Sequence, residues 1–226
     1  MKKMIQFSMV VFGMLMISAS SFGQGFDQID PNAKKVLDKV KAEYDTYTSM
    51  EATFDLVMEL PGQDAENQAG KVIQSGEKFN VDIGERLLIS DGTTLWHYIK
   101  KNNEVQINDA DLGEDETNML SPKAMLDLYE SSDYIYGIVA EPVVDGQRLI
   151  QIEFKPIDRD SEFSKMSLLL VKGKTEMKQM KVFSKDGSRF TLKIKDITAN
   201  KDYANAMFVF DESKYPEIYI EDLRID

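Results

Sequence analysis

The sequence predicts a mainly β fold with two or three helices, in which about a dozen short antiparallel strands form one long sheet that curls. Apolar and polar residues alternate over most of the chain, and turn signals such as Asp145-Gly146 and Asp186-Gly187 separate the runs. No βαβ rhythm appears, which favours a meander over a parallel sheet. About 200 residues beyond an export signal are enough for one domain with a substantial core.

Residues 1–23 are expected to be a cleaved export signal, which leaves residues 24–226 as a single mature domain. Lys2 and Lys3 precede an apolar run over residues 9–17, and the small residues Ser21 and Gly23 precede the expected cut before Gln24. The run is shorter than the roughly 20 apolar residues that span a bilayer. The chain has no cysteine, so it has neither a disulfide nor the acylated residue of a lipoprotein signal. We therefore expect a free periplasmic protein without a lipid anchor.

The chain is acidic, with a formal net charge of −12 that becomes −14 when Lys2 and Lys3 leave with the signal. Binding to nucleic acid, or static adhesion to anionic lipid headgroups, needs a basic face, and none is evident in the sequence. Basic partners remain compatible with this charge. The protein is expected to be a monomer.

The first element is expected to be a helix that begins near Asp30 and runs to about Tyr47. Pro31 follows Asp30, and a capping carboxylate before a proline at the first helical position favours a helix start. Apolar residues then recur at spacings of three and four, which predicts one apolar face that must pack on something. This face carries Val36, Leu37, Val40, Tyr44 and Tyr47.

From Met50 the apolar period changes to two, with Phe54, Leu56 and Met58 alternating with mostly polar residues. The same period returns in later segments as far as Phe210. The expected strands cover residues 50–60, 70–74, 78–83, 86–90, 93–100, 104–107, 134–139, 148–155, 165–172, 177–184, 189–197 and 207–210.

Asp91-Gly92 lies between two β-rich arms, which is a strong hairpin signal. A two-residue loop at Asp91-Gly92 pairs Ser90 with Thr93 and Leu88 with Leu95 on one face. The other face then carries Leu87, Ile89, Thr94 and Trp96. Because both faces are apolar, we expect other parts of the chain to pack against each side of this hairpin.

The strand pattern stops between Asp109 and Asp133, where Ser121-Pro122 begins a short apolar helix. Two short helices cover the concave face of a curled sheet incompletely, which predicts an apolar cavity; a fully packed sandwich is an equally good alternative. The lid residues are expected to be Val36, Leu37, Val40, Met125, Leu126 and Tyr129, and the cavity residues Phe54, Leu56, Met58, Leu87, Ile89, Trp96 and Tyr98.

An enzyme is not indicated. His97 is the only histidine, and no nucleophile elbow, histidine-based metal motif or phosphate loop is present. An acidic run could attract calcium, but its spacing does not fit an EF-hand, and we expect a solvated loop instead. That run contains Asp109, Asp111, Glu114, Asp115 and Glu116. No cofactor or metal is expected.

Several short motifs follow one another along the chain. Residues 49–54 follow an exported helix, a strand begins at Gly70, Ser-Asp-Gly-x-x-Leu-Trp-x-Tyr covers residues 90–98, and Leu120-Ser121-Pro122 precedes an apolar helix. Late strands then surround Asp186-Gly187. On these motifs the chain resembles the outer-membrane lipoprotein carrier family, LolA, over nearly the whole expected mature protein.

The resemblance implies an unclosed half-barrel whose concave face is covered by a helical lid. It implies a periplasmic carrier, or chaperone, that binds the acyl chains of lipoproteins. An inner-membrane lipoprotein-release transporter would supply this cargo and an outer-membrane receptor would accept it. The family usually has an arginine after the first Gly-led strand, but residues 73–79 contain none, and Lys78 supplies charge without a planar bidentate donor. The alternatives are an envelope sensor built on the same half-barrel and a carrier of another lipid.

Overall fold

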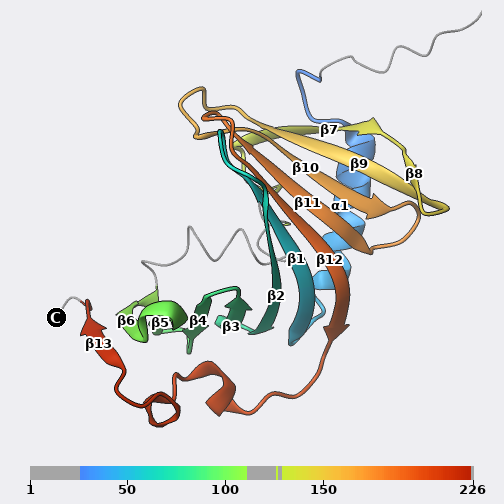
Figure 1. Cartoon of the computed structure of the whole chain (residues 1–226). Coiled ribbons are helices and arrows are strands. Elements are labelled where there is room, and N and C mark those ends of the chain that lie inside the picture. Colours follow the sequence, from blue (N-terminus) through green and yellow to red (C-terminus); the bar gives the residue numbers. More distant parts are fainter. Residues whose placement is uncertain (1–25, 111–125, 127–128, 225–226) are drawn as a thin grey trace, which may run out of the picture.

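A computed structural model describes residues 26–110, 126 and 129–224, and these form one 13-stranded sheet with one long helix (Figure 1). The helix is α1 (Pro31–Tyr44), and short 3-10 turns occur at η1 (Lys100–Asn102), η3 (Asn205–Phe208) and η4 (Glu212–Lys214). The strands are β1 (Met50–Glu59), β2 (Glu66–Ser75), β3 (Lys78–Ile83), β4 (Arg86–Ser90), β5 (Thr94–Ile99), β6 (Glu104–Asp109), β7 (Tyr134–Ala140), β8 (Val143–Val144), β9 (Gln147–Pro156), β10 (Phe163–Val171), β11 (Met177–Ser184), β12 (Arg189–Ala199) and β13 (Tyr219–Asp222).

The strand order is β13-β6-β5-β4-β3-β2-β1-β12-β11-β10-β9-β7, with β8 paired to β9. All pairs are antiparallel except β13 with β6. The two end strands, β13 and β7, do not pair with each other, so the sheet curls without closing (Figure 1). The expected mainly β fold with an unclosed antiparallel sheet is confirmed.

Helix α1 lies on the concave side of the sheet and begins where the sequence predicts (Figure 1). The Asp30 carboxylate accepts the Asn32 N–H at 2.8 Å and the Ile138 N–H at 3.3 Å, so one residue caps α1 and ties it to β7. The helix ends at Tyr44 rather than Tyr47, because the N–H and hydroxyl of Thr46 both donate to the Glu43 carbonyl.

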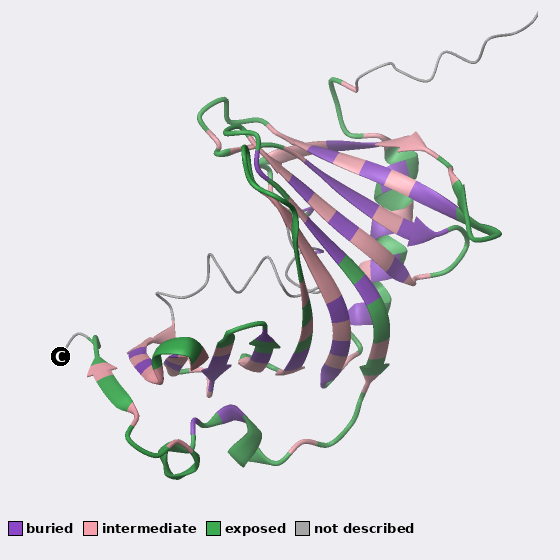
Figure 2. Cartoon of the chain, viewed as in Figure 1, coloured by how far each residue is buried: buried purple, intermediate pink, exposed green. Residues whose placement is uncertain are grey.

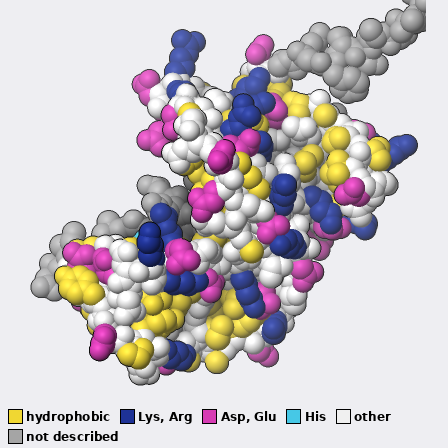
Figure 3. Space-filling model, viewed as in Figure 1, with side chains coloured by type: hydrophobic (Ala, Val, Ile, Leu, Met, Phe, Trp, Pro, Cys, Tyr) yellow, Lys and Arg dark blue, Asp and Glu magenta, His cyan; other side chains and the backbone are white. Residues whose placement is uncertain are grey.

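Figure 2 shows bands of buried and more exposed residues on the long strands β1 and β9–β12; burial alternates over the first half of β1 and the second half of β9, whereas Met166, Ser167 and Leu168 of β10 are all buried. The outward-facing residues of these strands form cross-strand ion pairs, with nitrogen–oxygen distances of 2.6 Å for Lys195–Asp55, 2.7 Å for Lys165–Glu153 and 3.0 Å for Lys181–Glu59. Cationic and acidic side chains are accordingly interspersed on this outer face (Figure 3). The inward-facing residues form the main core.

The β4–β5 hairpin has the predicted faces but not the predicted loop. Ser90 pairs with Leu95 and Ile89 with Trp96, so the loop is Gly92-Thr93, one residue further along than expected. The Asp91 carboxylate explains the shift, because it accepts the N–H groups of Thr93 at 2.9 Å and Thr94 at 2.8 Å. Moving the loop by one residue shifts the pairing between the two arms by two residues. Because the side-chain period of a strand is two, each side chain stays on its predicted face.

Both faces of this hairpin are covered, as predicted. Leu88 and Leu95 belong to the main core on the concave side. The outer side is covered by the C-terminal segment, which begins with η3 instead of the strand expected over 207–210. Asn80 Nδ2 donates to the Met207 carbonyl at 2.8 Å, which takes that carbonyl away from strand pairing. The resulting outer cluster contains Ile89, Tyr98, Val105 and Phe210, with Leu87, Trp96, Tyr215 and Ile218 packed against it.

Three expectations fall on residues that the structure does not describe. The helix expected from Pro122, with Met125, and most of the acidic run at 109–116 lie outside the described residues. The same holds for the export signal at 1–23.

Replacing Asp91 with alanine is expected to lower the free energy of unfolding by about 1–2 kcal/mol at neutral pH, because two N–H groups lose a charged acceptor. Burial of Asp91 raises the pKa of its carboxyl, but the N–H donors of Thr94 and Thr93 outweigh it, and the net pKa is lowered. A lowered pKa stabilises the fold above the unfolded value of about 3.9 and ceases to do so as pH falls through the folded value. Urea titrations at several pH values should show the difference between wild type and Asp91→Ala shrinking below about pH 4.

Candidate functional site

One half of the concave face is packed against α1. Ala33, Leu37 and Val40 of α1 are fully buried, and Val36 is partly buried against the same core. Leu126 and Tyr129 join this core, and the Tyr129 hydroxyl donates to Asp38 Oδ1 of α1 at 3.2 Å. The described residues of the expected lid therefore do lie over the concave face of the sheet.

The other half of the concave face holds an apolar groove of about 460 Å³. Its lining comes from β1–β4 on one side and from β10, β11 and β12 on the other. The apolar residues of the groove are Leu56, Met58, Ile83, Leu88, Phe163, Met180, Val182, Phe190 and Leu192. A second hollow of about 590 Å³ shares Phe163 and Phe190 with it and continues to the loop end of the sheet at Leu60.

Strand register places the groove residues side by side. Leu192 pairs with Leu56 of β1 and with Met180 of β11. Phe190 likewise pairs with Met58 and with Val182. Paired residues of an antiparallel sheet lie on the same face, so three neighbouring strands contribute one continuous apolar surface.

Phe54 lies in the floor next to the groove rather than in its lining. It pairs with Gly70, and a Cβ at Gly70 would lie 2.4 Å from Phe54 Cε2. The missing side chain of Gly70 thus makes room for the ring, which is 1% exposed.

The mouth of the groove is polar. Glu66, Gln68, Glu85 and Arg86 complete its lining. Gln68 Nε2 donates to Glu66 Oε1 at 2.6 Å, and the Gln68 side chain lies over the β3–β4 turn. That turn uses Gly84 at φ +52, and a Cβ there would lie 2.7 Å from Gln68 Oε1. An apolar chain can therefore enter the groove while its polar end remains at a hydrated rim.

The structure separates the residues that the sequence grouped as one cavity. Leu56 and Met58 line the groove, whereas Leu87, Ile89, Trp96 and Tyr98 lie in the outer cluster against Phe210. Placing these four in the cavity was wrong, because alternation along β4 and β5 turns them away from Leu88 and Leu95. Lys78 also lies on the outer side, where its Nζ donates to Asn205 Oδ1 at 3.1 Å, so it does not replace a lid arginine.

Most of the groove lining was not singled out from the sequence. Met180, Phe190 and Leu192 lie on strands that the period-two pattern did predict, whereas Phe163 begins β10 two residues before the strand expected over 165–172. The alternation within each segment was a usable signal, but the adjacency of β1 and β12 is not visible in a local pattern.

Comparison with known proteins identifies the family. Residues 45–211 match the model described as outer membrane lipoprotein carrier protein LolA. The chain belongs to the LolA family. A curated relative, an uncharacterized protein of Methanocaldococcus jannaschii, is 25% identical over 185 residues, which cover 79% of this chain and 51% of that protein. The chain thus spans about half the length of the curated relative it matches.

Solved structures are similar to this LolA-family chain in fold. An uncharacterized conserved protein from Thermus thermophilus has a TM-score of 0.53 at 14% identity, with 86% of this chain and 99% of that chain covered. A LolA superfamily protein from Nitrosomonas europaea has a TM-score of 0.40 at 14% identity, with 79% and 97% covered. Within the described part of the LolA-family chain, no helix has the length and apolar character to cross a membrane, and no three acidic, histidine or cysteine side chains are grouped to hold a metal.

Proposed function

We propose that this protein is a periplasmic carrier that binds acyl chains of lipoproteins in the apolar groove and moves them from the inner to the outer membrane. The observation that carries the proposal is the groove itself, an apolar hollow with a polar mouth in a LolA-family sheet. An inner-membrane release transporter would load the groove and an outer-membrane receptor would empty it. Such proteins bind without catalysing a reaction, and no cofactor is required.

The groove is sized for reversible binding. At roughly 30 Å³ for a methylene, similar to the share of a water molecule in its liquid, 460 Å³ holds about fifteen methylenes. At about 0.8 kcal/mol for each buried methylene, one chain contributes on the order of 12 kcal/mol before the costs of association, which is below the practical ceiling of affinity. The groove alone thus has room for about one acyl chain, and further chains of a lipoprotein would extend into the adjoining hollow of about 590 Å³ or use space opened by movement of the lid at Val36, Leu37, Val40, Leu126 and Tyr129.

The same volume favours a second candidate function. A carrier or sensor of a lipid with one acyl chain would fit the groove without any widening. The two functions differ in cargo, so an experiment on lipoproteins separates them.

The test mixes residues 24–226 with spheroplasts that hold radiolabelled lipoproteins. We expect labelled lipoprotein in the supernatant as a soluble one-to-one complex after the membranes are pelleted. Native mass spectrometry of the purified protein should then show lipoprotein mass in place of a small lipid. Supernatant without label, together with a bound single-chain lipid in the spectrum, would reject lipoprotein transport and support the second candidate.

A further inference from the structure

The polar mouth of the apolar groove carries more acid than base. Glu66 and Glu85 line it together with Arg86, and none of these three exposed residues forms an ion pair with another described residue. The amide of Gln68 donates to Glu66 at 2.6 Å, which leaves the negative charge of that carboxylate in place. The polar end of a lipid in the groove therefore meets two carboxylates and one guanidinium.

The acid excess continues along the concave face next to the mouth. Strand pairing carries this face from Arg86 to Ile99 and then to Glu104. Gln106 donates to Glu104 at 3.1 Å and to Glu221 of the neighbouring strand at 3.2 Å. An amide thus lies between these two carboxylates and leaves their charges uncompensated.

The cations near the two ends of this apolar space are offset by acids. Lys100 reaches the β3–β4 turn beside the mouth, where Asp82 pairs with it. At the loop end of the sheet, the adjoining hollow of about 590 Å³ is lined by Glu162 and Asp186 against Lys185. Both openings of the apolar space are therefore acidic.

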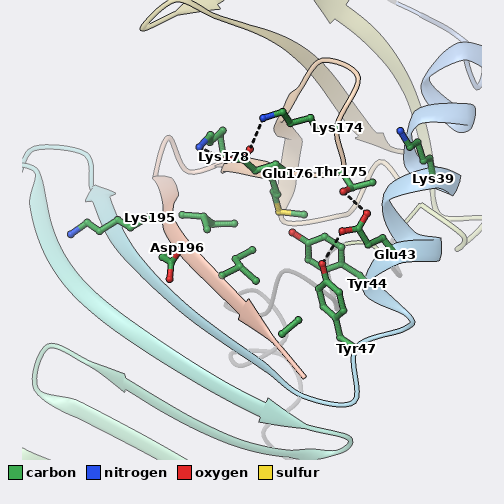
Figure 4. Close-up of a pocket in the computed structure, with 14 residues that line it drawn as sticks. Lys39, Glu43, Tyr44, Tyr47, Lys174, Thr175, Glu176, Lys178, Lys195 and Asp196 are labelled. Atoms are coloured by element: carbon green, nitrogen blue, oxygen red, sulfur yellow. Dashed lines mark hydrogen bonds and ion pairs between the residues drawn. The ribbon is translucent and has the colours of Figure 1, made fainter. Parts of the chain in front are cut away.

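Another cavity of the chain has balanced charges. It has a volume of about 530 Å³ and lies between the end of α1 and β12 (Figure 4). Within its lining Glu176 pairs with Lys178, and Lys195 pairs with Asp55 at 2.6 Å. No described residue lines both this cavity and the groove. The acid excess at the groove is therefore not a general property of hollows in this acidic chain.

We propose that the mouth of the groove selects acyl chains whose polar end carries no negative charge, and that Glu66 and Glu85 determine this selection. The inference rests on the carrier function proposed above and specifies its cargo as an acylated polypeptide whose first residues are uncharged or basic. A phosphate at the end of an acyl chain is repelled by both glutamates. Anionic phospholipids are then rejected although their chains fit the groove, which keeps the carrier free for protein cargo.

The first experiment compares lipids that share a single lauroyl chain and differ in the charge of the polar end. Calorimetric titration of residues 24–226 measures the affinity of neutral monolauroylglycerol, cationic lauroylcholine and anionic lauroyl lysophosphatidylglycerol. At an ionic strength of about 10 mM, where charges act over about 30 Å, we expect the anionic lipid to bind at least about fivefold more weakly than the neutral one. The cationic lipid should bind at least as tightly as the neutral one, and the differences should shrink at about 0.5 M salt.

The outcomes separate this inference from the carrier function. Equal affinity for all three lipids overturns the selection and retains the groove as a lipid site. Absence of binding by all three overturns the proposed function, and the selection with it.

Variants test whether the mouth is the source of the selection. Glu66→Gln combined with Glu85→Gln removes two charges with little change in shape, and should reduce the discrimination against the anionic lipid to about twofold. The matched control, Glu77→Gln combined with Glu212→Gln, removes the same charge at exposed residues outside the described lining of the groove, and should leave the discrimination unchanged. Urea titration verifies the fold of each variant. Discrimination that persists in the mouth variant, or that is lost equally in the control, overturns the proposal.

Discussion

Replacing Met58 with glutamate is expected to reduce the affinity for an acyl chain at least about 100-fold, because an ionised side chain in an occupied apolar groove loses several kcal/mol of solvation. Met58 pairs with Phe190 and lines the groove, but it is only partly buried in the unoccupied protein. The Met58→Glu protein should therefore fold, but its complex with an acyl chain should be much less stable. Displacement of a fluorescent fatty acid measures the effect directly.

A matched control lies next to Met58 on the same strand. Val57 is also partly buried and faces the outer side, where it pairs with Thr191. Val57→Glu adds the same charge to the same strand and should leave acyl affinity within about threefold of wild type. Equal losses in both variants would point to a general effect of charge, and unchanged affinity in Met58→Glu would remove β1 from the binding site. Phe54→Asp is a poor test, since Phe54 is buried over Gly70 and its replacement should unfold the protein.

The fold could be predicted from the sequence because its signals are local. Asp30-Pro31 marked the start of α1, and period-two alternation marked nearly every strand of the sheet. The errors occur where one side chain decides between neighbouring geometries. The Asp91 carboxylate moves the hairpin loop by one residue, and the bond from Asn80 to the Met207 carbonyl favours η3 over a strand.

The candidate site was only partly predictable. Leu56 and Met58 were expected in the cavity and do line the groove. The apolar residues Leu87, Ile89, Trp96 and Tyr98 resemble cavity residues in sequence, but both faces of their hairpin are covered. Which face is concave depends on the curl of the whole sheet and on the return of the C-terminal segment, and neither is encoded within the hairpin.

The second large effect concerns that C-terminal segment. Replacing Phe210 with alanine is expected to lower the free energy of unfolding by about 3–4 kcal/mol, as is usual for a fully packed phenylalanine. The Phe210 ring stacks on Tyr215 with centroids 4.8 Å apart and lies 5.5 Å from Tyr98. Its loss leaves a void between these rings and removes the cover from Ile89 and Val105. Urea or thermal unfolding of the two proteins measures the difference.

Met207→Ala provides the comparison, because Met207 lies on the same segment and is 41% exposed. Its replacement should change the free energy of unfolding by no more than about 0.5 kcal/mol. A small effect of Phe210→Ala as well would mean that the segment is dispensable and that the outer face of β4 and β5 is stable when exposed. A large effect confined to Phe210 would instead establish that the outer cluster is a second core. The C-terminal segment would then support the outer face of the β4–β5 hairpin, whose Leu88 lines the groove on the other face. Acyl affinity in Phe210→Ala should therefore fall only to the extent that the hairpin becomes less ordered.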